Sequence, residues 1–212
     1  MNLTTHAVIT GDVVNSREIS GRVDLLEVLE STMHHVCKKF NAESEIYRGD
    51  SFQLDIPKPH EVAAAAILIR SDMIARSPSK RDIWDVRLSI GVGKREFTAN
   101  RVSSSGGQAY ELSGSGIDEI AKKKQKLIIK TPLSQVDHDL DLITRFADDI
   151  ISNWSQFSAE AVFWALYESD SQEEIAKLIG RSQPTVNTRL KTAKYKLLKA
   201  YINRVEEIVR TL

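Results

Sequence analysis

The sequence has few of the features that mark secreted or membrane proteins. Its single cysteine, Cys37, excludes an internal disulfide, and without a second cysteine no zinc-ligand spacing is present. No apolar run approaches the roughly 18 residues that cross a bilayer, and the opening stretch MNLTTHAVITGD lacks the basic and long apolar regions of a signal peptide. We therefore expect a cytoplasmic protein with no membrane partner, and Cys37 packed in its core.

The chain also lacks an excess of either charge, because its formal net charge is zero over 212 residues. The charges are nevertheless unevenly distributed. Residues 171–212 carry nine Lys or Arg against four Glu, which leaves the first 170 residues at minus five. Between Arg181 and Arg204 there are seven basic residues and no acidic one. This distribution is typical of a small nucleic-acid-binding unit attached to a larger domain.

Hydrophobic patterns of strand and helix length alternate along the first 130 residues. Apolar side chains recur at intervals of three and four over residues 22–40, which predicts a helix. The segments HAVITGDVV, SEIYR, SFQLDI and VRLSIGVG read as strands, and EVAAAAILIRSDMIA reads as a buried helix. The order is βαββαβ, followed by a helix over 109–124 and a short strand, KLIIK. One antiparallel hairpin with helices packed on one face of a sheet predicts an α+β, ferredoxin-like arrangement. Because the connections across such a sheet are right-handed, we expect the first strand to lie beside the hairpin.

Two aspartates follow glycines at the ends of expected strands. Asp50 lies in the hairpin sequence RGDSF, and Asp12 lies in the first strand, VITGDVV. Turn and capping chemistry would explain either aspartate alone. Because an unpaired carboxylate is costly to bury and the two strands are expected to be neighbours, we favour a shared site for one divalent cation, Mg²⁺ or Mn²⁺.

At these residues the sequence resembles a known group of proteins. Asp12, RGDSF, RLSIGVG and the helix opening GQAYELSGSGIDEI are similar to the palm-type catalytic domain of class III nucleotidyl cyclases and of GGDEF-type diguanylate cyclases. Among such proteins the chain resembles the small bacterial SatD family, and the resemblance covers residues 6 to about 130. It implies that Asp12 and Asp50 hold metal ions that bind a nucleotide triphosphate.

The sequence departs from that group where the reaction would need positive charge. Class III enzymes carry an Asn and an Arg in the helix after the glycine, and Glu111 and Ser115 stand at the aligned positions. Ser51 stands where a diguanylate cyclase needs a Glu. Loss of a cation at the transferring phosphate would remove most turnover while leaving nucleotide binding possible. The basic residues that could replace it, and bind nucleotide, are Arg48, Lys94 and Arg95.

The last 55 residues follow the helix-turn-helix plan. An apolar helix, SAEAVFWALYE, precedes a short helix capped by Ser171 with Glu174 as its capping-box partner. The turn IGRS leads to Ser182, the expected N-cap of a helix that continues to the end of the chain. The pattern EEIAKLIGRSQPTVNTRLKTAK resembles region 4 of sigma factors and related response-regulator domains. A helical hairpin used only for packing would explain the expected core, Ile175, Ala176, Leu178, Val186 and Leu190, but not the polar and basic opposite side.

That opposite side predicts a DNA-reading surface. Its side chains are first polar, suited to base edges, and then basic, suited to phosphates. The residues suited to base edges are Gln183, Thr185, Asn187 and Thr188, and those suited to phosphates are Arg181, Arg189, Lys191 and Lys194. The apolar tail of the last helix either packs back on the first domain or pairs with a second chain in a homodimer; it comprises Leu197, Leu198, Tyr201, Val205, Ile208 and Val209.

These observations predict three regions: a cyclase-like domain over 1–132, a helical linker over 133–157 and a helix-turn-helix domain over 158–212. We favour a DNA-binding transcriptional regulator whose degenerate cyclase-like domain binds nucleotide and divalent metal as a sensor, or serves as an assembly surface, without being an enzyme. The alternative is an active metal-dependent nucleotidyl cyclase or transferase with an accessory helical domain. No catalytic residue is assigned from the sequence.

Overall fold

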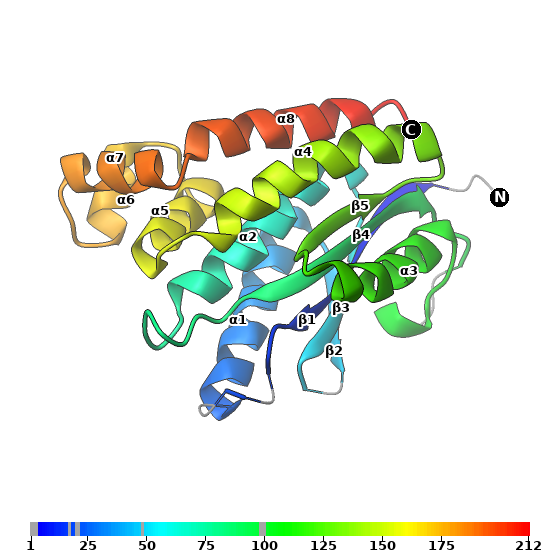
Figure 1. Cartoon of the computed structure of the whole chain (residues 1–212), viewed down its shortest axis with the longest axis horizontal. Coiled ribbons are helices and arrows are strands. Elements are labelled where there is room, and N and C mark those ends of the chain that lie inside the picture. The colour runs from blue at the N-terminus through cyan, green and yellow to red at the C-terminus, as the bar shows by residue number, and fades with distance from the viewer. Residues whose placement is uncertain (1–3, 17, 20–21, 48, 98–100) are drawn as a thin grey trace.

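The computed structural model describes residues 4–16, 18–19, 22–47, 49–97 and 101–212. Figure 1 shows a sheet at one end of the molecule and a group of helices at the other. The predicted order βαββαβ, followed by a helix and a strand, is confirmed. The elements are β1 (Thr5–Val13), α1 (Arg22–Phe40), β2 (Glu43–Tyr47), β3 (Ser51–Ile56), η1 (Pro59–Glu61), α2 (Val62–Ala75), β4 (Val86–Lys94), η2 (Val102–Ser104), α3 (Gln108–Lys123), β5 (Leu127–Lys130), α4 (Ser134–Ser152), α5 (Gln156–Tyr167), α6 (Gln172–Leu178), α7 (Gln183–Thr192) and α8 (Tyr195–Val209).

The sheet has five strands in the order β2-β3-β1-β4-β5. The central strand β1 is antiparallel to both of its neighbours, β3 and β4, and β5 extends the sheet parallel to β4. The predicted neighbourhood of the first strand and the hairpin is therefore confirmed. This register also decides which side chains can meet at each end of the sheet.

Helices α1 and α2 bury different fractions of their surfaces. In α1 the buried apolar side chains recur at the predicted spacing of three and four, from Leu25 to Phe40, so one stripe of the helix faces the core. Helix α2 is buried over almost its whole length because it lies between the sheet and α5. Cys37 is only partly buried; its Sγ donates to Ser44 Oγ at 3.2 Å, and burial raises the pKa of the thiol.

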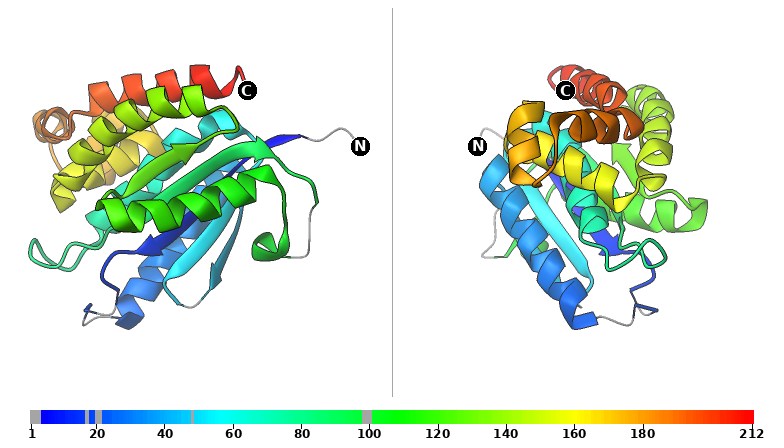
Figure 2. Two further views of the ribbon diagram at one scale, coloured as in Figure 1. Left: turned by 45° about the vertical axis from the view of Figure 1, so that its right-hand side comes forward. Right: turned by 90° about the vertical axis from the view of Figure 1, so that its left-hand side faces the viewer.

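The expectation that all helices pack on one face of the sheet is wrong. Figure 2 shows α3 on the face opposite α1 and α2. Along β4, Leu88, Ile90 and Val92 enter the main core, whereas the side chains between them face α3. Small residues permit this close packing: a Cβ at Gly91 would lie 2.1 Å from the carbonyl oxygen of Ala109 on α3. The alternation of large and small residues in RLSIGVG is the local signal for helices on both faces.

Five helices follow β5, and they share the core of the sheet. The segment expected to be a linker is mostly α4, whose Leu140, Ala147 and Ile151 are buried in the same hydrophobic cluster as the strands. Helix α8 lies beside α4 (Figure 1) and buries Leu198 and Val205 in that cluster. The tail therefore packs back on the chain, the first of the two expected arrangements.

The last helix is not continuous, contrary to the sequence expectation. Helix α7 ends at Thr192, and Lys194 has a φ of 54°, in the left-handed region, before α8 starts at Tyr195. The change of direction lets the apolar face of α8 reach α4 and α2 while α7 stays with α5 and α6.

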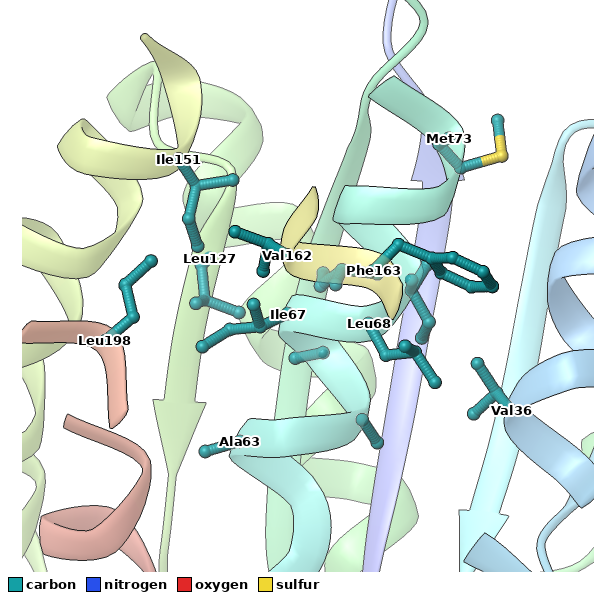
Figure 3. Close-up of a cluster of buried hydrophobic side chains, with 14 of the residues drawn as sticks. Val36, Ala63, Ile67, Leu68, Met73, Leu127, Ile151, Val162, Phe163 and Leu198 are labelled. Carbon is teal, nitrogen blue, oxygen red and sulfur yellow. The ribbon is translucent and has the colours of Figure 1, made fainter. Parts of the chain in front are cut away.

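Figure 3 shows how the two halves of the chain share side chains. Ile151 of α4, Val162 of α5 and Leu198 of α8 lie around Ile67 of α2, next to Leu127 of β5. All five are at most 1% exposed. The fold is thus a mixed α+β structure whose five-stranded sheet and C-terminal helices share one continuous core.

A buried group of charges joins the same elements. The guanidinium of Arg70 in α2 is fully buried and donates to Asp85, just before β4, at 2.9 and 2.7 Å. It also donates to Asp148 of α4 at 2.6 Å and to Ser152 at 3.0 Å. Lys126 pairs with Asp85 at 2.9 Å. These contacts fix α4 against α2 and against the segments that lead into β4 and β5.

Candidate functional site

The pairing of β1 with β3 places the two aspartates at the same end of the sheet. Asp12 lies opposite Ser51 of β3, and Asp50 precedes Ser51 in the chain. The amide of Val13 donates to the carbonyl of Asp50 at 2.9 Å. Gly49 has a φ of 83°, which favours glycine and belongs to the turn chemistry expected of this hairpin. The backbone therefore brings the two aspartates to the same end of the sheet, but successive strand residues face opposite sides, so the register alone does not bring their carboxylates together.

Each aspartate already has a partner in the structure. Arg87 of β4 lies opposite Asp12 in the register, and its Nε donates to Asp12 Oδ1 at 2.9 Å while Nη2 donates to Oδ2. The hydroxyl of the buried Ser16 donates to Asp50 Oδ2 at 2.5 Å. A permanently charged guanidinium thus neutralises the carboxylate that would hold a cation.

This arrangement does not fit a divalent cation. Mg²⁺ and Mn²⁺ prefer several oxygen ligands at one point, and both oxygens of Asp12 are engaged by Arg87. Among the described residues, no group of three or more His, Cys, Asp or Glu side chains gathers as a metal site. A shared cation between Asp12 and Asp50 remains a prediction, and these contacts argue against it.

Of the three expected nucleotide-binding cations, Lys94 and Arg95 are not brought to the aspartates. Lys94 lies opposite Thr5, seven residues along β4 from Arg87, which is about 20–25 Å at the rise of a strand. Arg95 follows it and pairs with Asp55 at 2.8 Å. Arg48 lies outside the described residues. The positions aligned with the missing Asn and Arg of class III enzymes, Glu111 and Ser115, are exposed on α3.

The residue group around Asp55 was not anticipated from the sequence. Asp55 is 3% exposed, and its carboxylate contacts His6 Nδ1 at 2.6 Å, the hydroxyl of Tyr110 at 2.7 Å and Arg95. Burial disfavours the charged carboxylate, but these partners outweigh burial and hold the pKa of Asp55 below its usual value. Burial and the neighbouring carboxylate raise the pKa of the Tyr110 hydroxyl. The group ties β1 and β3 to α3, and only the register of the sheet reveals it.

At the other end of the molecule lie α5, α6 and α7, where the sequence predicts an apolar helix, a short helix and the start of the last helix. Ser171 accepts a hydrogen bond from the amide of Glu174, and Gly180 has a φ of 63° in the turn before α7. Ser182 occupies the N-cap position, but its hydroxyl contacts Thr185 Oγ1 at 2.9 Å instead of a backbone amide. The predicted core residues Ile175, Ala176, Val186 and Leu190 are buried; Leu178 is 48% exposed, so its assignment to the core is wrong.

Most of the expected DNA-contacting side chains lie on the outer side of this unit. Thr185 is partly buried, and Thr188 Oγ1 donates to the carbonyl of Pro184 at 3.0 Å. Arg189 differs, because its Nη1 pairs with Glu160 of α5 at 2.5 Å and its guanidinium lies 4.9 Å from the centre of the Phe157 ring. The exposed residues are Arg181, Gln183, Asn187, Thr188, Lys191 and Lys194.

A groove runs beside this surface, between α7 and the start of α8. Its volume is about 670 Å³, and its lining includes Lys191, Lys194, Lys196 and Lys199. Lys199 pairs with Asp170 at 2.5 Å. Lys196 was not assigned a role from the sequence, because the break between α7 and α8 that turns it toward the groove was not predicted.

The family of the chain follows from its sequence. A family model described as the SatD family matches residues 6–209. The chain belongs to the SatD family. No curated protein matches this SatD chain in sequence. No helix in the described part of the SatD chain is both long and apolar enough to cross a membrane.

The SatD chain is also similar to solved structures of cyclase domains. A bacterial light-regulated adenylyl cyclase is 11% identical, with 61% of this chain and 77% of that chain covered and a TM-score of 0.46. The active GGEEF domain of a diguanylate cyclase from Vibrio cholerae is 12% identical, with 60% and 83% covered and a TM-score of 0.44. The GGDEF domain of DgcB from Caulobacter crescentus, in complex with c-di-GMP, is 16% identical, with 60% and 78% covered and a TM-score of 0.45.

Proposed function

We propose that this SatD chain is a DNA-binding regulator that reads DNA with the first turns of α7. One observation carries the proposal. Helix α7 buries Val186 and Leu190 against its neighbours and leaves Gln183, Asn187 and Thr188 exposed. A helix held by buried apolar side chains after a tight turn, with exposed polar side chains in its first turns, is the arrangement that a helix-turn-helix presents to the major groove.

The charges around α7 support the same proposal. Arg181 precedes α7, Lys191 lies in its last turn, and Lys194 and Lys196 follow it along the groove. In the described part of the chain none of these four forms an ion pair, in contrast to Arg189 and Lys199. Cations without acidic partners are suited to phosphate oxygens, which position a protein on DNA without specifying sequence. The cyclase-like half would then act as a nucleotide sensor or as an assembly surface.

Titration of genomic fragments with the full chain in gel-shift experiments tests this function. We expect Asn187→Ala to weaken binding to the preferred fragment by roughly 1–3 kcal/mol, or about 5- to 150-fold, and to change binding to other fragments little. Lys177→Ala on α6 is the matched control, because Lys177 is exposed and its one ion pair among the described residues is with Glu173 of its own helix. If no fragment shifts at low salt, the proposal is wrong.

A second candidate is a metal-dependent nucleotidyl cyclase or transferase. The observation that favours it is the pairing of β1 with β3, which brings Asp12 and Asp50 to one end of the sheet. Incubation of the full chain with nucleotide triphosphates and Mg²⁺ or Mn²⁺, followed by chromatography for cyclic or dinucleotide products, tests it directly. A product that the native chain forms and the Asp12→Asn variant does not form would support an enzyme. If the native chain forms no product from any of the four nucleotides, the regulator is the candidate that remains.

A further inference from the structure

The contact between Asp12 and Arg87 has the geometry of a built ion pair. The two residues are direct cross-strand neighbours in the register of β1 and β4. Two guanidinium nitrogens face the two carboxylate oxygens, the fork-to-fork geometry that makes arginine the preferred partner of a carboxylate. The side chains of Arg87 and Asp12 are 31% and 24% exposed, so the ion pair is partly withdrawn from water at the end of the sheet.

A divalent cation would compete with Arg87 for the same oxygens. Metal ions contact carboxylate oxygens at about 2.0–2.6 Å, and the guanidinium already contacts both oxygens of Asp12. Arginine does not lose its proton in proteins, so the positive charge of Arg87 stays in place at every pH at which the chain is folded.

We propose that Arg87 occupies the position of a divalent cation beside Asp12, so that the native chain does not bind metal there. Removing this positive charge frees both carboxylate oxygens of Asp12 for a cation. The inference concerns only the second candidate function, because Asp12 and Arg87 lie in β1 and β4 and not in α7. A failure of the DNA-binding proposal and a failure of this one therefore have separate readouts.

Binding of Mn²⁺, followed by electron paramagnetic resonance and by calorimetry on the full chain, tests the proposal. We expect no saturable binding by the native chain at millimolar Mn²⁺. The variant Arg87→Met keeps most of the side-chain volume and loses the charge. It is expected to gain one saturable Mn²⁺ site, with a dissociation constant at least tenfold below the millimolar concentration at which the native chain shows none. Arg87→Lys keeps the charge and is expected to gain nothing. Adding Asp12→Asn to Arg87→Met is expected to remove the new site.

Two results would overturn the proposal. The first is saturable Mn²⁺ binding by the native chain that Asp12→Asn abolishes, since a metal would then displace Arg87. The second is a folded Arg87→Met variant, with the circular dichroism spectrum of the native chain, that gains no Mn²⁺ site. If Arg87→Met does not fold, Mn²⁺ binding by the native chain and by Asp12→Asn still tests the first result. The variant Arg87→Gln then takes the place of Arg87→Met in testing the second.

Discussion

Replacing Arg70 with methionine should destabilise the chain by about 3–5 kcal/mol, the usual cost of breaking a buried ion pair. Methionine fills the space of the side-chain stem but removes all four hydrogen bonds to Asp85, Asp148 and Ser152. It leaves the carboxylates of Asp85 and Asp148, whose residues are 3% and 7% exposed, without their guanidinium. Lys126 still pairs with Asp85, which keeps the cost from exceeding that range.

Thermal unfolding followed by circular dichroism measures the effect. For a chain of this length, each 1 kcal/mol lowers the melting temperature by about 2–4 °C, so we expect a decrease of roughly 6–20 °C. Arg145→Met is the matched control on α4, because Arg145 pairs with Asp141 at 3.0 Å with the two side chains 56% and 36% exposed. Exposed pairs contribute about 0–1 kcal/mol. Equal decreases for the two variants would refute the assignment of Arg70 as the buried connection.

The dependence on pH gives the same prediction a second readout. Burial disfavours the charge of Asp85, but Arg70 and Lys126 outweigh burial and hold the pKa of this carboxyl below its ordinary value. The stabilisation is therefore complete above the unfolded pKa of about 3.9 and is lost as the pH falls through the lower pKa of the folded state. We expect the free energy of unfolding of the native chain to fall below about pH 4, and to fall less steeply in Arg70→Met. A steeper fall in the variant would contradict this linkage.

Three further predictions follow from packing and from buried charge. Gly91→Ala should lower the free energy of unfolding in urea by about 1–3 kcal/mol, because its Cβ would meet the backbone of α3 at Ala109, which cannot move aside as a side chain could. An unchanged free energy of unfolding would contradict the close packing of α3. Leu198→Ala should lower the free energy of unfolding by about 2–5 kcal/mol, whereas Leu197→Ala, at an adjacent position that is 61% exposed, should lower it by less than about 0.5 kcal/mol. Similar decreases for the two variants would refute the placement of α8. Asp55→Asn should reduce the loss of stability at acid pH, because the pKa of Asp55 is lowered in the folded chain and its stabilisation disappears as the pH falls; an unchanged acid limb of the stability curve would argue against this network.

Local patterns were sufficient for most of the elements. The spacing of three and four in α1 corresponds to a buried stripe, and the alternation in β3 corresponds to Phe52, Leu54 and Ile56 facing the core. The order of the elements, with the rule that crossovers are right-handed, was enough to place β1 beside the hairpin. These features depend on residues close together in the sequence.

The contacts that decide the chemistry depend on register and could not be read in the same way. Arg87 lies 75 residues from Asp12, and only the exact pairing of β1 with β4 brings them together. The contact of Arg189 with Glu160 depends on how α7 crosses α5. The break at Lys194 has no glycine or proline to mark it, and a left-handed conformation at lysine is unfavourable unless the packing of α8 compensates for it.

The salt dependence of DNA binding by the full chain tests the central claim most directly. Fluorescence anisotropy on a preferred fragment gives the slope of log K against log salt concentration, to which each phosphate contact contributes about −0.9. Because Lys191 is exposed and Arg189 is paired with Glu160, we expect Lys191→Gln to make the slope shallower by about that amount and Arg189→Gln to change it little. Absence of measurable binding by the native chain at low salt, or an unchanged slope in Lys191→Gln, would contradict the account.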